Sequence, residues 1–334
     1  MNKLFDIKRT KMIDEAAFMH KPSSSGKLFG IFLLVIILCN LASGLIVGLV
    51  TTVHDTIIYS QNGVYDTMLE IIDAGGSAND AMKYLEDNML DLPWWITFVT
   101  LFSNAVTIFG AIFYCKKFEK RSLSSMGIRK AGVAVELLLG LAIGALLLSA
   151  VFCVLHFSGA VVFERHPFDS RIIRPSIILY FFGYLVKVVA DELLYRGFFL
   201  TSLSRDTRPI FSALLTALVF SLFNFGSIFM FINSFLFSFL LNVYVLKRGS
   251  LWGTIAMRFV WCFGEAAVLG TTGLGAALFI PKYSTSMLLL TGEPGYGLDS
   301  GLLATIIFIF AIFIILLLKT KKSEQSCVEI EYFR

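Results

Sequence analysis

Residues 28–53 read LFGIFLLVIILCNLASGLIVGLVTTV and contain no charged side chain. An apolar stretch of about 20 residues is long enough to cross the hydrocarbon core of a bilayer as a helix. Lipid offers no partners for backbone N–H and C=O groups, so a spanning segment of this kind must be helical. The stretch therefore predicts a membrane-spanning helix, and it makes an all-α membrane helix bundle the expected fold class.

The composition of the whole chain points the same way. Of its 334 residues, 57% are hydrophobic and 16% are charged, whereas soluble domains are about 45–50% apolar and about 25% charged. This excludes a soluble enzyme, a secreted disulfide scaffold and a disordered chain. The basic residues do not form a pattern that predicts a basic face for binding nucleic acid. The five cysteines show no paired spacing and are expected to be buried thiols.

Further apolar segments predict a polytopic bundle of about eight transmembrane helices. Besides residues 28–53, the expected spans are Trp94–Tyr114, Ala131–His156, Pro175–Phe199, Pro209–Gly226, Ile228–Leu246, Leu251–Gly270 and Gly301–Leu318. The fifth and sixth of these are separated by almost no residues, so they are expected to form a tight helical hairpin.

The charges of the loops predict the orientation. Residues 115–130 hold six basic residues and one acid, whereas residues 54–92 hold eight acids and one lysine. Basic loops stay in the cytoplasm. We therefore expect a cytoplasmic N-terminal segment at 1–27, two helices within 28–114 that flank an acidic extracellular loop, and a cytoplasmic tail within 306–334. Both termini of this multi-pass cell-membrane protein are expected to be cytoplasmic.

The acidic loop 54–92 contains a helix-start signal. Ser77 and Asp80 have the spacing of a capping box, and apolar residues follow at helical spacing. One interpretation is a surface that docks an extracellular partner. The other is an amphipathic connector that lies on the membrane, which is a common role for such helices.

Charged residues inside spans are expensive and are candidate functional residues by default. Glu192 and Arg196 are four residues apart, so they share a helix face and can pair. Asp191 points about 100° away from Glu192 and can face a bundle cavity. The structural alternative is a buried ion pair that only locks the helix. Glu136 begins the third span and is expected to reach water. Other charges at depth are Lys187, Arg258 and Glu265.

An ordered set of motifs resembles the CAAX-protease and bacteriocin-processing (CPBP) family of intramembrane proteases. The set comprises Asp191-Glu-Leu-Leu-Tyr-Arg196-Gly197, then Phe220-Ser-Leu-Phe-Asn224, then Gly249-Ser-Leu-Trp252 leading into Arg258-Phe-Val-Trp-Cys262. The resemblance covers roughly residues 115–305, and it implies a CAAX-protease-like core and a bacterial plasma membrane.

The resemblance also implies which positions carry chemistry. The family's paired acids correspond to Asp191 and Glu192, of which a glutamate activates water, and the family arginine corresponds to Arg196. Asn224 and Arg258 stand at the two histidine positions, and Cys262 stands at the asparagine position. The resemblance thus nominates Glu192, Asp191, Asn224 and Arg258 as motif-equivalent catalytic positions and Arg196 and Cys262 as binding positions. We expect no metal and no cofactor, because Arg258 would repel a cation.

Three functions follow as alternatives. The first is a non-catalytic member that binds or scaffolds a membrane or cell-envelope protein partner. The second is an active CAAX-type intramembrane endopeptidase that acts on a peptide substrate and uses Glu192 to activate water. The third is a small-solute transporter, against which stands the lack of an inverted repeat.

Overall fold

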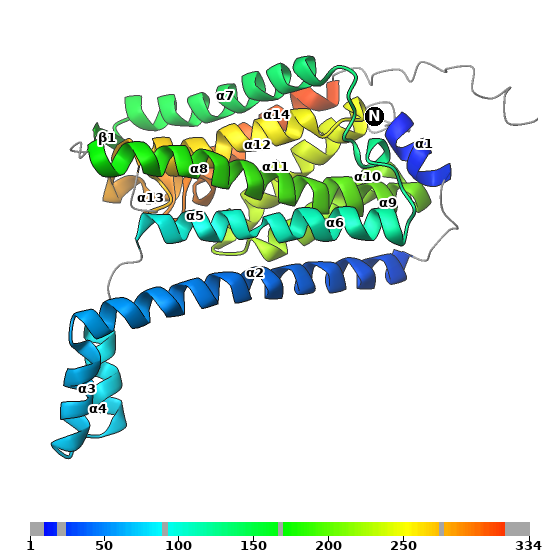
Figure 1. The fold of residues 1–334 in the computed structure, drawn as a ribbon. Coiled ribbons are helices and arrows are strands. Elements are labelled where there is room, and N and C mark those ends of the chain that lie inside the picture. Colours follow the sequence, from blue (N-terminus) through cyan, green and yellow to red (C-terminus); the bar gives the residue numbers. More distant parts are fainter. Residues whose placement is uncertain (1–9, 19–24, 89–92, 166–169, 274–276, 318–334) are drawn as a thin grey trace, which may run out of the picture.

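The computed structural model describes residues 10–18, 25–88, 93–165, 170–273 and 277–317. The predicted class is confirmed: the chain folds as an all-α membrane helix bundle (Figure 1). Within these described residues, four helices are long and apolar enough to cross a membrane, at Gly26–Gln61, Trp94–Lys117, Val133–Phe157 and Ile228–Arg248, and two shorter apolar helices lie at Pro209–Phe223 and Leu302–Leu317. The count of eight spans, the domain boundaries and the placement of the termini stay predictions.

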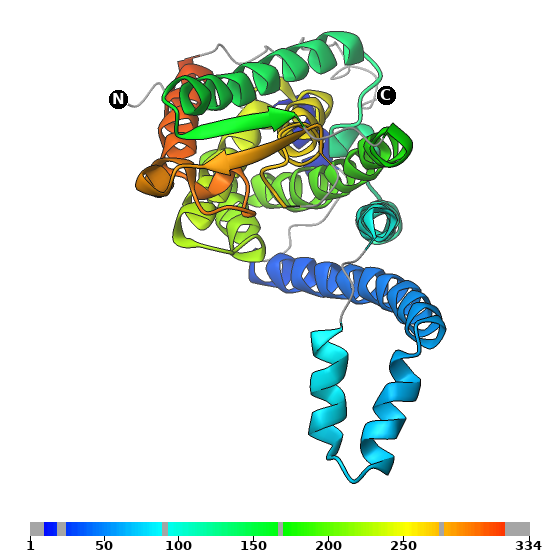
Figure 2. The ribbon, with the colours of Figure 1, turned by 90° about the vertical axis from the view of Figure 1, so that its left-hand side faces the viewer.

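The N-terminal half is built from helices, two of which lie outside the bundle. Its helices are α1 (Lys11–Phe18), α2 (Ser25–Gln61), α3 (Val64–Asp73), α4 (Ala78–Asp87), α5 (Trp94–Ser103), α6 (Ala105–Lys117), the short η1 (Ser124–Met126) and α7 (Val133–Phe157). The first span is longer than predicted, because α2 continues past residue 53. Both views show α3 and α4 as a helical hairpin that projects from the far end of α2 (Figures 1 and 2).

The C-terminal half holds the core helices and their irregular connections. They are α8 (Ser170–Asp191), the π-helix η2 (Glu192–Leu200), α9 (Thr201–Asp206), α10 (Pro209–Phe223), α11 (Ile228–Arg248), α12 (Trp252–Phe263), the π-helix η3 (Gly264–Val268), η4 (Thr285–Met287), α13 (Leu288–Thr291), η5 (Leu298–Ser300) and α14 (Leu302–Leu317). Local sequence signals explain where several of these helices begin and end. Pro209 opens α10, the Ser227 side chain accepts the N–H of Met230 to cap α11, and Gly249 ends α11 at φ 67°.

A small sheet was not foreseen from the sequence. Strand β1 (Val161–Arg165) pairs antiparallel with β2 (Phe279–Tyr283), with Val161 opposite Tyr283 and Arg165 opposite Phe279. Figure 2 shows the two strands side by side at one end of the bundle. The stretch between η3 and α14 thus contributes a strand and the short helix α13.

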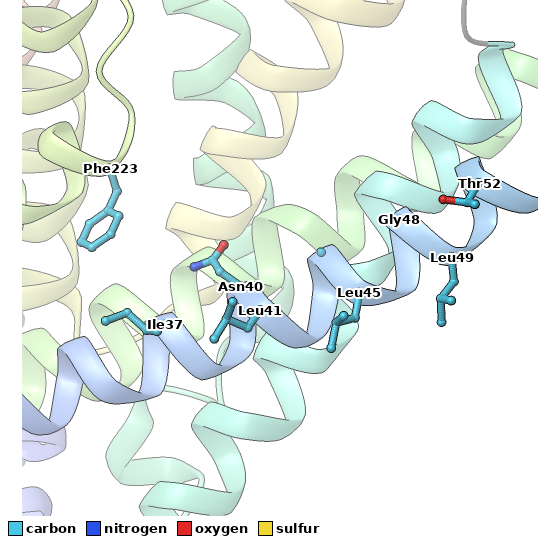
Figure 3. Close-up of a pocket in the computed structure, with 9 residues that line it drawn as sticks. Ile37, Asn40, Leu41, Leu45, Gly48, Leu49, Thr52 and Phe223 are labelled. Carbon is cyan, nitrogen blue, oxygen red and sulfur yellow. The ribbon is translucent and has the colours of Figure 1, made fainter. Parts of the chain in front are cut away.

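Burial separates the centre of the bundle from its edge. In its most apolar window α11 has 61% of its residues buried, against 11% for α2. The close approach of α7 to α12 depends on glycines, since a Cβ at Gly144 would lie 2.7 Å from the carbonyl oxygen of Met257. By contrast, one face of α2 borders a groove of about 670 Å³, whose lining includes Asn40, Gly44, Gly48 and, from α10, Phe223 (Figure 3).

Candidate functional site

The candidate site lies where α8 passes into the π-helix η2. Asp191 is the last residue of α8, and Glu192 is the first of η2. The extra residue in a π-helical turn rotates the following side chains relative to a continuous α-helix, and such turns are frequent at functional sites. Side chains from α10, α11 and α12 complete the surroundings of these two acids.

Glu192 and Arg196 form a fully buried ion pair. Arg196 Nη1 donates to Glu192 Oε1 at 3.0 Å, and both side chains have an exposed fraction of 0%. Arg196 Nε also donates to Asn242 Oδ1 at 3.0 Å, and Nη2 donates to Ser238 Oγ at 2.7 Å. Asn242 in turn donates to the Ala213 carbonyl oxygen at 2.8 Å. The pair therefore joins η2 to α11, and through Asn242 to α10.

Arg258 on α12 bridges the two adjacent acids. Its Nη2 donates to Asp191 Oδ2 at 2.7 Å, and its Nη1 lies 3.6 Å from Glu192 Oε1. Lys187 Nζ also donates to Asp191 Oδ2 at 3.0 Å. An arginine at the depth of a span needs an acid or water nearby, and the two carboxylates meet that need. The four residues Asp191, Glu192, Arg196 and Arg258, with Lys187, are called the charge cluster below.

The ring of Phe220 on α10 lies against the charge cluster. The guanidinium carbon of Arg196 lies 5.0 Å from the ring centroid, and that of Arg258 lies 4.6 Å from it. Each distance is within the range of a cation–π interaction. One aromatic ring thus contacts both arginines.

Four of the six nominated residues lie together in the charge cluster. The other two are Asn224 and Cys262. Asn224 caps the end of α10 and donates its side-chain amide to the Phe220 carbonyl oxygen at 2.8 Å. The contact shown for Asn224 is thus within its own helix, although the resemblance nominated it as a catalytic position together with the acids. Cys262 lies one turn after Arg258 and is a half-buried free thiol.

Sequence reasoning missed three contributors, namely Phe220 as a ring against the arginines, Ser238 and Asn242. Ser238 and Asn242 are four residues apart in the most buried span, so they present two polar groups on one helix face. That spacing was the available signal. Glu136 was also misjudged, because it is 3% exposed and accepts hydrogen bonds from Tyr244 Oη at 2.9 Å and Arg248 Nη2 at 2.7 Å.

The charge cluster keeps two free hydrogen-bonding positions. Glu192 Oε2 and Arg258 Nη1 are buried, and neither has a hydrogen-bond partner among the described residues. One can accept a hydrogen bond and the other can donate one. Within the same described residues, no group of three or more His, Cys, Asp or Glu side chains could hold a metal ion.

A comparison with known protein families gives a match in this region of the chain. The model of the type II CAAX prenyl endopeptidase Rce1-like family matches residues 172–264, which include the whole charge cluster, Asn224 and Cys262. No curated protein and no solved structure matches the chain. The predicted resemblance is confirmed for residues 172–264, which are similar to the type II CAAX prenyl endopeptidase Rce1-like family.

Proposed function

We propose that this protein is a non-catalytic CPBP member that binds or scaffolds a membrane or cell-envelope protein, from a cell membrane in which both termini are cytoplasmic. The observation that carries the proposal is that both candidate carboxylates are already engaged by cations. Asp191 is 2.7 Å from Arg258 and 3.0 Å from Lys187, and Glu192 is 3.0 Å from Arg196.

This arrangement is poorly suited to hydrolysis. A general base must accept a proton from water, and neighbouring positive charges favour the carboxylate that has not accepted one. Arg258 is permanently charged, so it cannot exchange a proton near neutral pH as a histidine does. Asn224 could donate to an oxyanion, but its amide is bonded to its own helix. The helix-fixing contacts of Arg196 are kept, as a binding or scaffolding role requires.

The hydrolysis test uses the full chain purified into lipid, with farnesylated and unmodified membrane peptides. We expect no turnover above that of the Glu192→Ala variant. The control is Glu164→Ala, which removes an exposed acid that pairs with Lys282 at the surface. Turnover that is lost in Glu192→Ala but kept in Glu164→Ala would overturn the proposal.

The binding half of the proposal has its own test. The wild-type chain should capture a partner protein from detergent-solubilised membranes. The Arg258→Met variant should fail to capture it, and the Glu164→Ala variant should capture it as the wild type does. The reason is that Arg258 carries one of the two free hydrogen-bonding positions of the charge cluster. Equal capture by all three forms would show that the charge cluster does not take part in binding.

One observation favours the active endopeptidase as a second candidate. Glu192 Oε2 has no hydrogen-bond partner in the described segments of the chain, and it could accept a proton from a water molecule held beside Arg258 Nη1. In that case Glu192 would activate water for attack on a peptide carbonyl, and Arg258 would stabilise the oxyanion. The hydrolysis test decides between the two candidates.

A further inference from the structure

Another buried acid outside the charge cluster lies in the π-helix that follows α12. Glu265 belongs to η3 and is 5% exposed. Its Oε1 accepts the backbone N–H of Leu298 at 2.6 Å. Leu298 lies in residues 292–301, a glycine-rich stretch called the latch loop below. A buried carboxylate therefore holds a loop that is more than 30 residues away in the sequence.

Backbone contacts fit the latch loop closely against η3. The N–H of Gly297 donates to the Thr271 carbonyl oxygen at 3.1 Å, and Thr271 Oγ1 donates to the Glu265 carbonyl oxygen at 3.1 Å. Gly297 has φ 82°, and a Cβ there would lie 2.5 Å from Glu265 Oε1. The loop can approach the carboxylate only because residue 297 is a glycine. On its other side, Asn233 donates to the Asp299 carbonyl oxygen at 2.7 Å.

The latch loop brings a second carboxyl group to Glu265. Asp299 follows Leu298 directly, and its carboxyl interacts electrostatically with that of Glu265. Asp299 Oδ1 is buried and has no hydrogen-bond partner among the residues that the structure describes. The indole of Trp261 lies beside both carboxyl groups.

Little positive charge is available to balance two carboxylates here. The titratable groups that interact with the pair are Arg258 and Cys262 on α12, Tyr184 on α8 and Tyr283 on β2. Arg258 is the cation among them, and its Nη2 is already bonded to Asp191. Two buried carboxylates without a cation of their own cannot both ionise cheaply, so one of them keeps a proton.

We propose that Glu265 and Asp299 form a proton-binding site in which one shared proton fastens the latch loop to η3. The proton removes the repulsion between the two carboxyl groups and turns one of them into a donor for the other. Loss of that proton leaves two buried like charges, which can separate only if the latch loop moves away from η3.

The direction of the pH response follows from Asp299. Burial raises the pKa of Asp299 from 3.8 to about 6, although Trp261 and Arg258 act in the opposite direction. The closed loop therefore binds a proton that the open loop releases, and low pH favours closure. The opening constant rises about tenfold per pH unit between pH 4 and pH 6, roughly 100-fold in all, and levels off above the raised pKa.

The test measures hydrogen exchange of residues 292–301 in the full chain in lipid discs, corrected for the intrinsic pH dependence of exchange. Protection in the wild type should fall about 100-fold between pH 4 and pH 7. Asp299→Asn should stay protected throughout, because an amide donates to Glu265 without titrating. Glu293→Gln is the matched control, since it removes an exposed acid of the same loop and should leave the response intact.

Three results would overturn the proposal. The first is wild-type protection that does not change with pH, and the second is an unchanged response in Asp299→Asn. If that variant does not fold, Glu265→Gln supplies the same comparison. The third is recovery of protection at pH 7 on addition of Ca²⁺ or Na⁺ alone, which would make the pair a metal-cation site. None of these results bears on hydrolysis, so the test is independent of the proposed function.

Discussion

Two buried carboxylate–arginine sites in the same bundle differ in how completely their hydrogen bonds are satisfied. In the first, Arg121 donates from all three guanidinium nitrogens, to Glu119, Ser125, Gly197, Thr201 and Ser202. Both oxygens of Glu119 lie within hydrogen-bonding distance of Ser202 Oγ. In the second, Glu192 Oε2 and Arg258 Nη1 of the charge cluster have no hydrogen-bond partner within the part of the chain that the structure describes. The side chains of Glu119 and Arg121 and those of Glu192, Arg196 and Arg258 are at most 4% exposed, whereas Asp191 and Lys187 are 17% and 31% exposed.

The difference separates a structural ion pair from a site that keeps binding capacity. A buried polar atom without a partner costs free energy, so a purely structural site is expected to satisfy all of its atoms. The Glu119–Arg121 pair meets that expectation, and it ties the segment after α6 to η2 and α9. The charge cluster does not meet it, which is the physical reason to place recognition of a polar group there.

The largest expected effect is on the satisfied site. Arg121→Met should lower the free energy of unfolding by about 3–5 kcal/mol, because Glu119 stays buried without its counter-ion. Denaturant unfolding in mixed micelles measures this. The double variant Arg121→Met with Glu119→Gln should recover part of the loss, since no charge is then left unpaired.

The matched change in the charge cluster is Arg258→Met. It should lower the free energy of unfolding by less, about 1–3 kcal/mol. The reason is that Asp191 stays paired with Lys187, and Glu192 stays paired with Arg196. If Arg258→Met costs as much as Arg121→Met, the distinction between a structural pair and a binding site fails.

A second prediction extends the contrast from hydrogen bonds to packing. Gly144→Ala places a methyl group 2.7 Å from the Met257 carbonyl oxygen on α12 and should destabilise by about 1–3 kcal/mol. Gly48→Ala is the control on α2, where a Cβ would have nothing within 4 Å, and it should change stability by less than about 0.5 kcal/mol. The same unfolding assay applies. A comparable loss in Gly48→Ala would show that the groove face of α2 is covered by another molecule.

The sequence predicts those features that depend on composition or on one helix. The fold class follows from apolar stretches, and the Glu192–Arg196 pair follows from spacing of four residues. Arg258 was nominated together with the two acids through the family resemblance. Features that depend on distant contacts were not predictable, such as the pairing of residues 161–165 with residues 279–283.

The backbone conformation also limited what could be predicted from the sequence. The π-helical turns at η2 and η3 rotate Glu192 and Glu265 relative to an ideal helix, and no residue pattern marks such turns. The partners of Arg196 on α11 are neutral, so a search for charges passed over Ser238 and Asn242. Glu136 was misjudged because its partner Arg248 is more than 100 residues away in the sequence.

The smallest expected effect concerns the hairpin of α3 and α4, which lies outside the bundle. The predicted capping box is confirmed, because Ser77 Oγ accepts the Asp80 N–H at 3.3 Å and Asp80 Oδ2 accepts the Ser77 N–H at 2.8 Å. Ser77→Ala should cost about 1 kcal/mol of local helix stability. Since its bonds are local, the loss should appear in hydrogen exchange of α4 and not in denaturant unfolding of the bundle.

The capping box also gives this prediction a pH dependence. The hydrogen bonds from the Ser77 side chain and backbone lower the pKa of Asp80 below 3.8. A lowered pKa means that the cap contributes stability above pH 3.8 and loses it as the pH falls through the folded value. Protection of α4 should therefore decline in acid, in the opposite sense to the latch loop, and Ser77→Ala should weaken that decline. A bundle that unfolds together with α4 would instead show that the hairpin and the core are one cooperative unit.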